Sequence, residues 1–98
     1  MADVFFHPDA QAEFQAGLSW YRRRSRRAAE RFDREVDRLL NALASVPDRY
    51  PLYDDVHREA ILTRYPYSLV YRVEPNGDIL VVAVAHASRE PGYWQDRD

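Results

Sequence analysis

The spacing of the apolar residues changes once along this chain, and that change limits the folds open to it. Up to Val46 the apolar residues recur every three or four positions, as on one face of a helix, whereas from His57 onward they alternate. An all-helical bundle or an all-β barrel does not show both periods in succession, so the pattern predicts an α+β protein. A chain of 98 residues has room for one such domain, spanning residues 1–98.

Two helices are predicted in the first half of the chain. Pro8 suits the first turn of a helix because its missing N–H costs nothing there, and we expect this helix over Pro8–Arg23. Ser25 can cap a second helix that ends at about Val46. The apolar stripes are Ala10, Phe14, Leu18 and Tyr21 on the first helix, and Ala29, Phe32, Val36, Leu39, Leu43 and Val46 on the second.

Four strands are predicted around these helices. Asp3–Phe6 is a short apolar run before the first helix, and alternation predicts strands over His57–Arg64 and Tyr67–Glu74. Pro75–Asp78 contains Asn-Gly and is typical of a hairpin turn. Ile79–Ala85 is apolar on both faces and is therefore expected to be the central strand. The predicted order is βααβββ, with a helical hairpin packed on one face of a mostly antiparallel sheet.

The core is predicted to draw on both layers, and two segments are left outside the regular elements. The connection Pro47–Asp55 is a loop of about ten residues, and His86–Asp98 is expected to form a turn or a short helix. The expected core residues are Phe14, Leu18, Phe32, Val36, Leu39, Val81, and Val82 or Val84.

Composition excludes several kinds of site. The chain has no cysteine, which removes disulfides, thiol nucleophiles and thiolate metal ligands, and neither a metal nor a cofactor is predicted. All 14 basic residues are arginine, so no lysine can act as a base, and the net charge of −2 argues against a general nucleic-acid-binding coat. The polar N-terminus and the lack of a long apolar run predict a cytoplasmic protein without a membrane contact.

Arginine gathers between and along the predicted helices. The run Arg22–Arg27 holds five arginines in six positions and is either a solvated turn or a docking site for an acidic partner or for phosphates. Glu30 with Arg34, and Arg31 with Glu35, stand four residues apart and are expected to form weak surface ion pairs.

The sequence of the last two predicted strands and of the segment after them resembles that of a known protein family. Arg64-Tyr-Pro-Tyr-Ser-Leu-Val-Tyr-Arg72, followed after the hairpin by Ile79-Leu-Val-Val-Ala-Val-Ala-His-Ala-Ser-Arg89-Glu-Pro-Gly-Tyr-Trp94, resembles the RelE/ParE toxin family of bacterial type II toxin–antitoxin modules. Trp20-Tyr21, Arg31-Phe32, Tyr50-Pro51 and Arg58 stand in the order of that family, so the resemblance covers residues 5–97.

The resemblance implies a growth-inhibiting toxin, often linked to plasmid stabilisation, that forms a hetero-oligomer with a cognate antitoxin. RelE-like members are ribosome-dependent mRNA endonucleases, whereas ParE-like members lack the nuclease residues and poison DNA gyrase. RelE-like enzymes use lysines that this chain lacks, so the resemblance favours the ParE-like branch. An mRNA endoribonuclease remains the alternative, and a degenerate toxin kept only as an antitoxin partner is a third.

The two branches make different residues important. Cleavage of RNA without a metal needs a proton acceptor, a proton donor and cations around one phosphate. The candidates for a nuclease site are His86, Arg64, Arg89 and Tyr93. A histidine that ends an apolar strand is also often only hydrogen-bonded to a loop carbonyl, and that role stays open for His86.

A binding toxin would instead contact its target or its partner with exposed side chains. Arg64 and Arg72 can equally bond the C-terminal segment or the Asp54-Asp55 loop, and Trp94 and Tyr93 are more often packed against a sheet than stacked on a base. The candidates for target or partner binding are Arg58, Arg72, Trp94, Arg97, Arg23 and Arg26.

Overall fold

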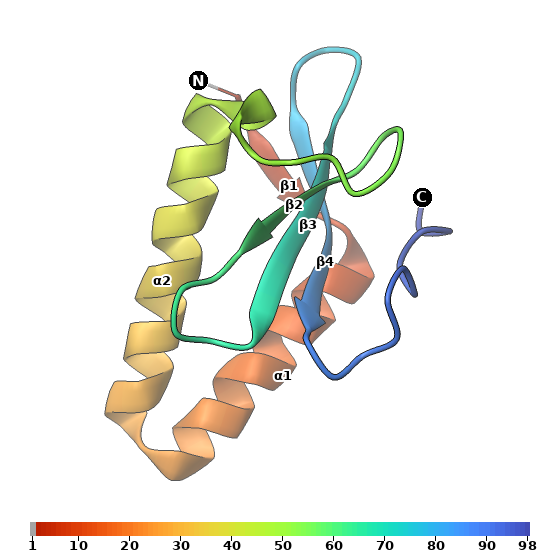
Figure 1. Ribbon diagram of the computed structural model, residues 1–98. Coiled ribbons are helices and arrows are strands. Elements are labelled where there is room, and N and C mark those ends of the chain that lie inside the picture. Colours follow the sequence, from red (N-terminus) through yellow and green to blue (C-terminus); the bar gives the residue numbers. More distant parts are fainter. Residues whose placement is uncertain (1) are drawn as a thin grey trace.

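The computed structural model describes residues 2–98 and places two helices across one face of a four-stranded sheet (Figure 1). The strands lie in the order β1-β4-β3-β2; β1 is parallel to β4 and the other neighbours are antiparallel. The predicted α+β fold with the order βααβββ is confirmed. The elements are β1 (Val4–Phe6), α1 (Pro8–Arg24), α2 (Arg26–Ser45), the 3-10 helix η1 (Pro47–Arg49), β2 (Arg58–Ile61), β3 (Tyr67–Val73) and β4 (Ile79–His86).

The helical hairpin is made by capping groups that the sequence supplies. His7 accepts a hydrogen bond from the N–H of Asp9 on Nδ1 (3.0 Å), and Pro8 occupies the first turn of α1. Ser25 ends α1 by donating its N–H to the carbonyl of Tyr21, and its Oγ accepts from the N–H of Ala28 (2.9 Å) to start α2. One serine thus serves both helices, so the chain reverses without an intervening loop.

The main core lies between the helices and the sheet. Phe32 of α2 is completely buried, and its ring lies 5.0–6.0 Å from the rings of Phe14, Tyr21, Tyr65 and Tyr67, measured between ring centres. Phe14 and Leu18 pack against this core but are only partly buried. The remaining predicted core residues are buried, namely Val36, Leu39, Val81, Val82 and Val84.

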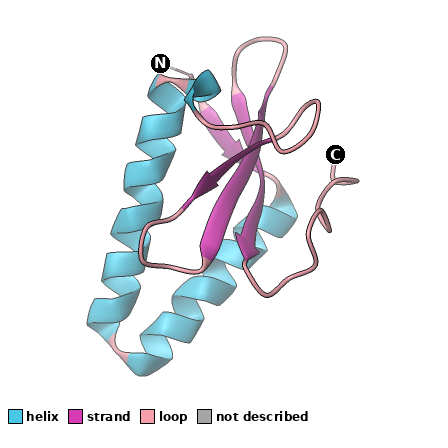
Figure 2. Ribbon diagram, in the orientation of Figure 1, coloured by secondary structure: helices cyan, strands magenta, loops and turns pink. Residues whose placement is uncertain are grey.

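The C-terminal segment covers the other face of the sheet. Trp94 is 2% exposed and packs with Val70, Val82 and Ala83. Residues 87–98 form successive turns, which lie on the side of the sheet away from the helices (Figure 2). This second small core explains why Ile79–His86 is apolar on both faces, as expected for the central strand.

Three local expectations are wrong. The strand predicted over His57–Arg64 is only Arg58–Ile61, because Arg64 has φ +74 and so lies in the left-handed region, which a strand does not use. Neither the Glu30–Arg34 nor the Arg31–Glu35 ion pair forms among residues 2–98; Glu35 pairs instead with Arg38, one helical turn away.

The Asn76-Gly77 hairpin turn is confirmed, with Gly77 at φ +91.

Other parts of the chain cover the stretch of β4 beyond β1 and the start of β2. β1 pairs with β4 only as far as Val81, where a bulge in β4 leaves Val82 without a partner on β3. Beyond that point the N–H of Val84 donates to Glu13, and the carbonyl of Val82 accepts from Arg97. At the opposite edge, Leu52 forms a bridge with Arg58 of β2, and Pro51 accepts from the N–H of Glu59.

In the part of the chain that the structure describes, neither helix combines the length and the apolar character that a membrane crossing requires.

Candidate functional site

Three residues form a carboxylate network that joins α1 to the C-terminal segment. Oε2 of Glu13 accepts from the Tyr93 hydroxyl (2.7 Å) and from Nη2 of Arg97 (2.9 Å). Oε1 accepts from Nη1 of Arg97 (2.9 Å) and from the N–H of Val84 (2.9 Å). The side chains of Glu13 and Arg97 are each 15% exposed. The two-pronged contact of Arg97 on Glu13 fixes both groups in one geometry.

The network changes the protonation of its members. Burial alone would raise the pKa of the Glu13 carboxyl, but hydrogen bonds from Arg97, Tyr93 and the Val84 N–H outweigh it, so the pKa lies below its ordinary value. Burial, together with the bond to Glu13, raises the pKa of the Tyr93 hydroxyl. Tyr93 therefore stays protonated at neutral pH and donates a hydrogen bond to the Glu13 carboxylate.

Three of the four candidate nuclease residues lie together. His86, Arg89 and Tyr93 line one pocket of about 240 Å³ beside the end of β4. The Arg89 guanidinium lies over the Tyr93 ring, 3.9 Å from its centre, and 4.0 Å from the Glu13 carboxylate. Arg64 lines a different pocket, at the turn between β2 and β3.

The ring of His86 is held at the end of β4. Nδ1 accepts from the N–H of Ser88 (3.0 Å) and lies 2.7 Å from the Ser88 hydroxyl, and the ring stands edge-on to Tyr67 at 4.9 Å between centres. Because Nδ1 accepts a backbone N–H, the neutral ring carries its proton on Nε2. The sequence left open a bond from His86 to a loop carbonyl; the local bond seen is of another kind, in which the ring accepts from the loop N–H of Ser88.

A second cluster anchors the C-terminal segment to the loop before β2. His57 is buried, its Nδ1 lies 2.9 Å from Oδ2 of Asp54, and its ring packs against Trp94 at 4.8 Å between centres. Gln95 donates to the same Asp54 oxygen (3.1 Å). Burial alone would raise the pKa of the Asp54 carboxyl, but hydrogen bonds from Gln95, Val56 and His57 hold it well below its usual range. Trp94 is thus a packing residue, and its expected place on a contact surface is wrong.

Two further candidate arginines bond the protein's own backbone. Arg58 donates from Nη1 to the carbonyl oxygens of Tyr50 (2.6 Å) and Asp48 (3.3 Å), which fastens η1 and its loop to β2. Arg72 donates to the carbonyl of Arg97 (3.1 Å), and so holds the C-terminal segment on the sheet. These bonds leave the two guanidinium groups less free to contact another molecule.

The remaining candidates are exposed. Arg23 and Arg26 form no ion pair among residues 2–98, and Arg23 lines a pocket of about 390 Å³ with Trp20, Tyr67 and His86. Arg24 lies over the Trp20 ring at 3.5 Å from its centre. This end of the hairpin therefore presents cations and an aromatic ring next to His86.

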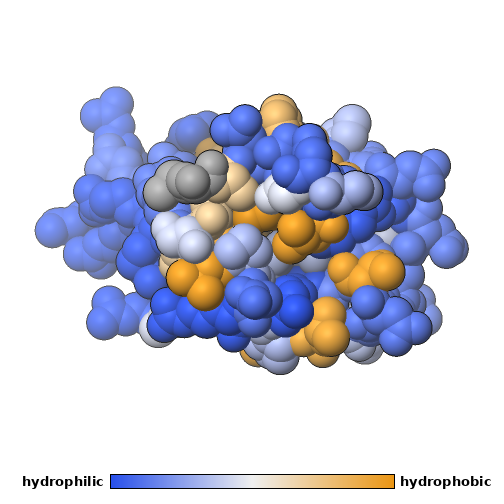
Figure 3. Space-filling view, turned by 90° about the horizontal axis from the view of Figure 1, so that it is seen from above, coloured by the Kyte–Doolittle hydropathy of each residue, from blue (hydrophilic) through white to orange (hydrophobic). Residues whose placement is uncertain are grey.

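An apolar pocket lies at the end of the molecule that carries η1. Leu52, Val56 and Val73 are exposed and line a pocket of about 560 Å³ with Pro47 and Arg58. Figure 3 views this end and shows hydrophobic side chains in patches among hydrophilic ones. We call this feature the apolar pocket.

Sequence reasoning missed Glu13, Asp54 and His57. No site role was predicted for Glu13, because a bond to Arg97, 84 positions away, leaves no local pattern. The available signal was an acidic residue about one helical turn after Ala10 and directly before Phe14, beside the apolar face of the helix.

The comparisons with known proteins agree with this fold. A family model described as the ParE toxin of the type II toxin–antitoxin system parDE matches residues 4–91. The chain belongs to this family of ParE toxins, as residues 64–94 suggested. Among solved structures, a chain of the chromosomal ParDE toxin–antitoxin system from P. aeruginosa superposes with a TM-score of 0.75 and 18% identity, covering 90% of this chain and 98% of that one. No curated protein matches the sequence.

Proposed function

We propose that this toxin acts in the cytoplasm by binding DNA gyrase, without chemistry of its own, and that a cognate antitoxin neutralises it. The observation that supports action without chemistry is the carboxylate network. Tyr93 and Arg97 are committed to Glu13, and Nδ1 of His86 is committed to Ser88. A phosphate entering this pocket would meet the Glu13 carboxylate, whose negative charge opposes that of the phosphate.

An mRNA endonuclease is the second candidate, and a specific observation favours it. His86, Arg89 and Tyr93 share one pocket, and metal-free RNA cleavage needs a group that takes the proton of the 2′-hydroxyl and another that protonates the leaving oxygen near one phosphate. For cleavage, Tyr93 would have to leave Glu13, and Arg64 would have to be replaced by another cation.

The substitution His86→Ala separates the two candidates. For a gyrase-binding toxin, the variant should still cause gyrase-dependent DNA breaks, because His86 then contributes only local contacts, its packing against Tyr67 and its bond with Ser88. For a nuclease, it should lower the rate of cleavage by about 10²–10⁴. Purified gyrase with supercoiled DNA, and primer extension on mRNA from cells expressing the toxin, measure the two activities. Arg89→Ala is the companion variant. Because Arg89 is 53% exposed and so available to a target, its replacement should lower gyrase poisoning. Cleaved mRNA that disappears in His86→Ala would refute the gyrase proposal.

The apolar pocket supports the antitoxin part of the proposal. Exposed apolar side chains around one pocket mark a surface that a partner covers, and a free chain carrying them is expected to self-associate. Val56→Asp places a charge in that surface and should weaken a 1:1 complex with the co-expressed antitoxin at least about tenfold. Phe5→Asp is the matched control, because Phe5 is 55% exposed against 58% for Val56 but lies on β1, at the other edge of the sheet. Light scattering and calorimetry measure the complex; equal affinities for the two variants would argue against this pocket.

A further inference from the structure

The exposed face of α2 carries a stripe of arginines that neither packing nor the proposed function uses. Arg31, Arg34 and Arg38 recur at intervals of three and four residues, so they share one face of the helix over about 10 Å. The turn between β2 and β3 brings Arg64 to the same place. These four arginines line a cleft of about 630 Å³, which we call the arginine cleft.

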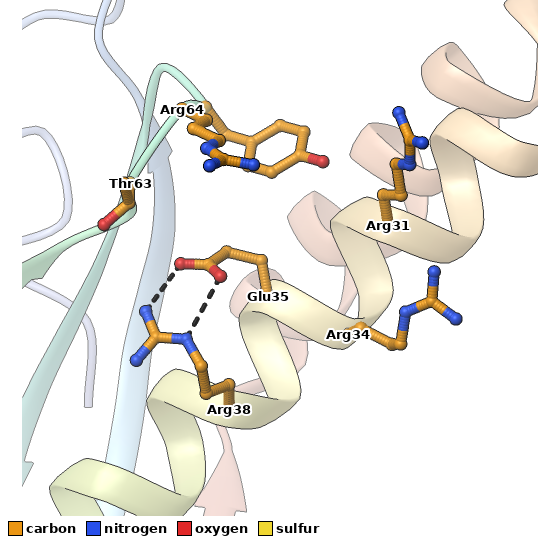
Figure 4. Close-up of a pocket in the computed structure, with 7 residues that line it drawn as sticks. Arg31, Arg34, Glu35, Arg38, Thr63 and Arg64 are labelled. Atoms are coloured by element: carbon orange, nitrogen blue, oxygen red, sulfur yellow. Dashed lines mark hydrogen bonds and ion pairs between the residues drawn. The ribbon is translucent and has the colours of Figure 1, made fainter.

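The charges in the cleft are not balanced. Glu35 is the one carboxylate lining it, and both of its oxygens accept from Arg38, at 2.6 and 3.1 Å. Arg31, Arg34 and Arg64 form no ion pair among the described residues 2–98. Figure 4 shows Arg64 on the turn and Arg31 on the helix, on either side of the opening above Glu35. Three guanidinium groups therefore surround one open volume in a chain whose net charge is −2.

The backbone of Arg64 is a second, independent observation. Its φ of +74 makes it the only residue other than glycine among residues 2–98 with a positive φ. Residues with a Cβ rarely adopt this conformation, because Cβ then crowds the backbone, and arginine lacks the short polar side chain that lets asparagine and aspartate tolerate it. The conformation sets Arg64 at the mouth of the cleft, and such strain gathers at binding sites.

The number of cations decides the class of ligand. A single carboxylate carries one charge and is matched by one guanidinium, as Glu35 with Arg38 already shows. Three further cations around one volume need a compact ligand with several charges. Linked phosphate groups supply these charges, and their oxygens fit the planar donors of arginine and the hydroxyl of Thr63, which also lines the cleft.

We propose that the arginine cleft binds a compact anion with two or more linked phosphate groups, held by Arg31, Arg34 and Arg64 while Glu35 keeps Arg38 in place. The site lies apart from the pocket of His86 and from the apolar pocket, so the proposal does not depend on the target of the toxin.

The test is calorimetric titration of the full chain with inorganic tripolyphosphate at about 0.1 M salt, where charges more than about 10 Å apart are screened. We expect one site per chain, and we expect Arg31→Ala and Arg64→Ala each to raise the dissociation constant about tenfold. Arg49→Ala is the matched control. It removes the same charge, but from an exposed residue on η1 that lies outside the cleft. Thermal unfolding of each variant without ligand checks that the fold is kept.

Three further ligands make the outcome decisive. A nucleoside triphosphate that binds as tightly as tripolyphosphate, or more tightly, supports the proposal and identifies a nucleotide as a source of the phosphates. A glutamate-rich peptide of equal charge that binds as tightly overturns it in favour of an acidic protein segment. A single-stranded oligonucleotide that binds more tightly than tripolyphosphate, or any binding unaffected by Arg31→Ala and Arg64→Ala, also overturns it.

Discussion

Phe32→Ala is expected to lower the free energy of unfolding by about 3–5 kcal/mol. The ring is completely buried and touches four other aromatic rings from α1 and from the β2–β3 turn and β3. It also fills the space beside Gly17, where an added Cβ would lie 3.1 Å from the Phe32 ring. Removing it leaves a cavity that the rigid helix crossing cannot close. Denaturant unfolding at neutral pH measures the loss.

Phe5→Ala is the matched control for that experiment. It removes the same ring from β1, where the side chain is more than half exposed, so the loss should be under about 1 kcal/mol. A domain of this size has a total stability of about 5–15 kcal/mol, so Phe32→Ala can bring it close to unfolding. Equal losses in the two variants would contradict the packing described here.

Glu13→Gln is expected to cost about 3 kcal/mol, at the lower end of the range for breaking a buried ion pair. The amide keeps the shape of the side chain but leaves the Arg97 guanidinium, buried against Val82, with only the exposed Asp9 carboxylate as a counter-charge, 3.7 Å from its Nε. Glu30→Gln is the control, since Glu30 is exposed on α2 and pairs with no cation among residues 2–98, and it should change stability by less than about 0.5 kcal/mol.

The same pair of variants carries a pH dependence with a definite sign. The pKa of Glu13 is lowered in the folded state, so its contribution is complete above the unfolded value of about 4.3 and is lost as the pH falls through the folded value. The stability difference between wild type and Glu13→Gln should therefore be full at pH 7 and should shrink below about pH 4. A difference that grew on acidification would refute the network.

Local sequence patterns were sufficient to predict the helices, the strands and the main core. The stripe through Phe32 and Val36 specifies which face of α2 is buried, Ser25 specifies where the helices meet, and Asn76-Gly77 specifies the hairpin. These features depend on residues within a turn or two of each other, so the sequence shows them directly.

The candidate site depends on contacts between distant residues, and there the sequence was a weaker guide. The nuclease candidates were chosen by residue type, which does not reveal that Tyr93 donates to Glu13, 80 positions away. Alternation also continued past Ile61, although the strand stops there because the backbone of Arg64 turns left-handed. A buried counter-ion and a strained turn are properties of the assembled fold, and no short pattern marks them.

The partly covered edges of the sheet limit how the free chain can associate. An open strand edge offers unpaired backbone groups to a second chain and leads to cross-β aggregates that do not dissociate. Here Glu13 and Arg97 occupy the backbone groups of β4 beyond β1, and Pro51 and Leu52 cover the start of β2. Self-association is therefore expected to use side chains of the apolar pocket, and to be reversed by a partner that covers them. The covered backbone groups thus leave fewer sites at which a fibril could begin to grow.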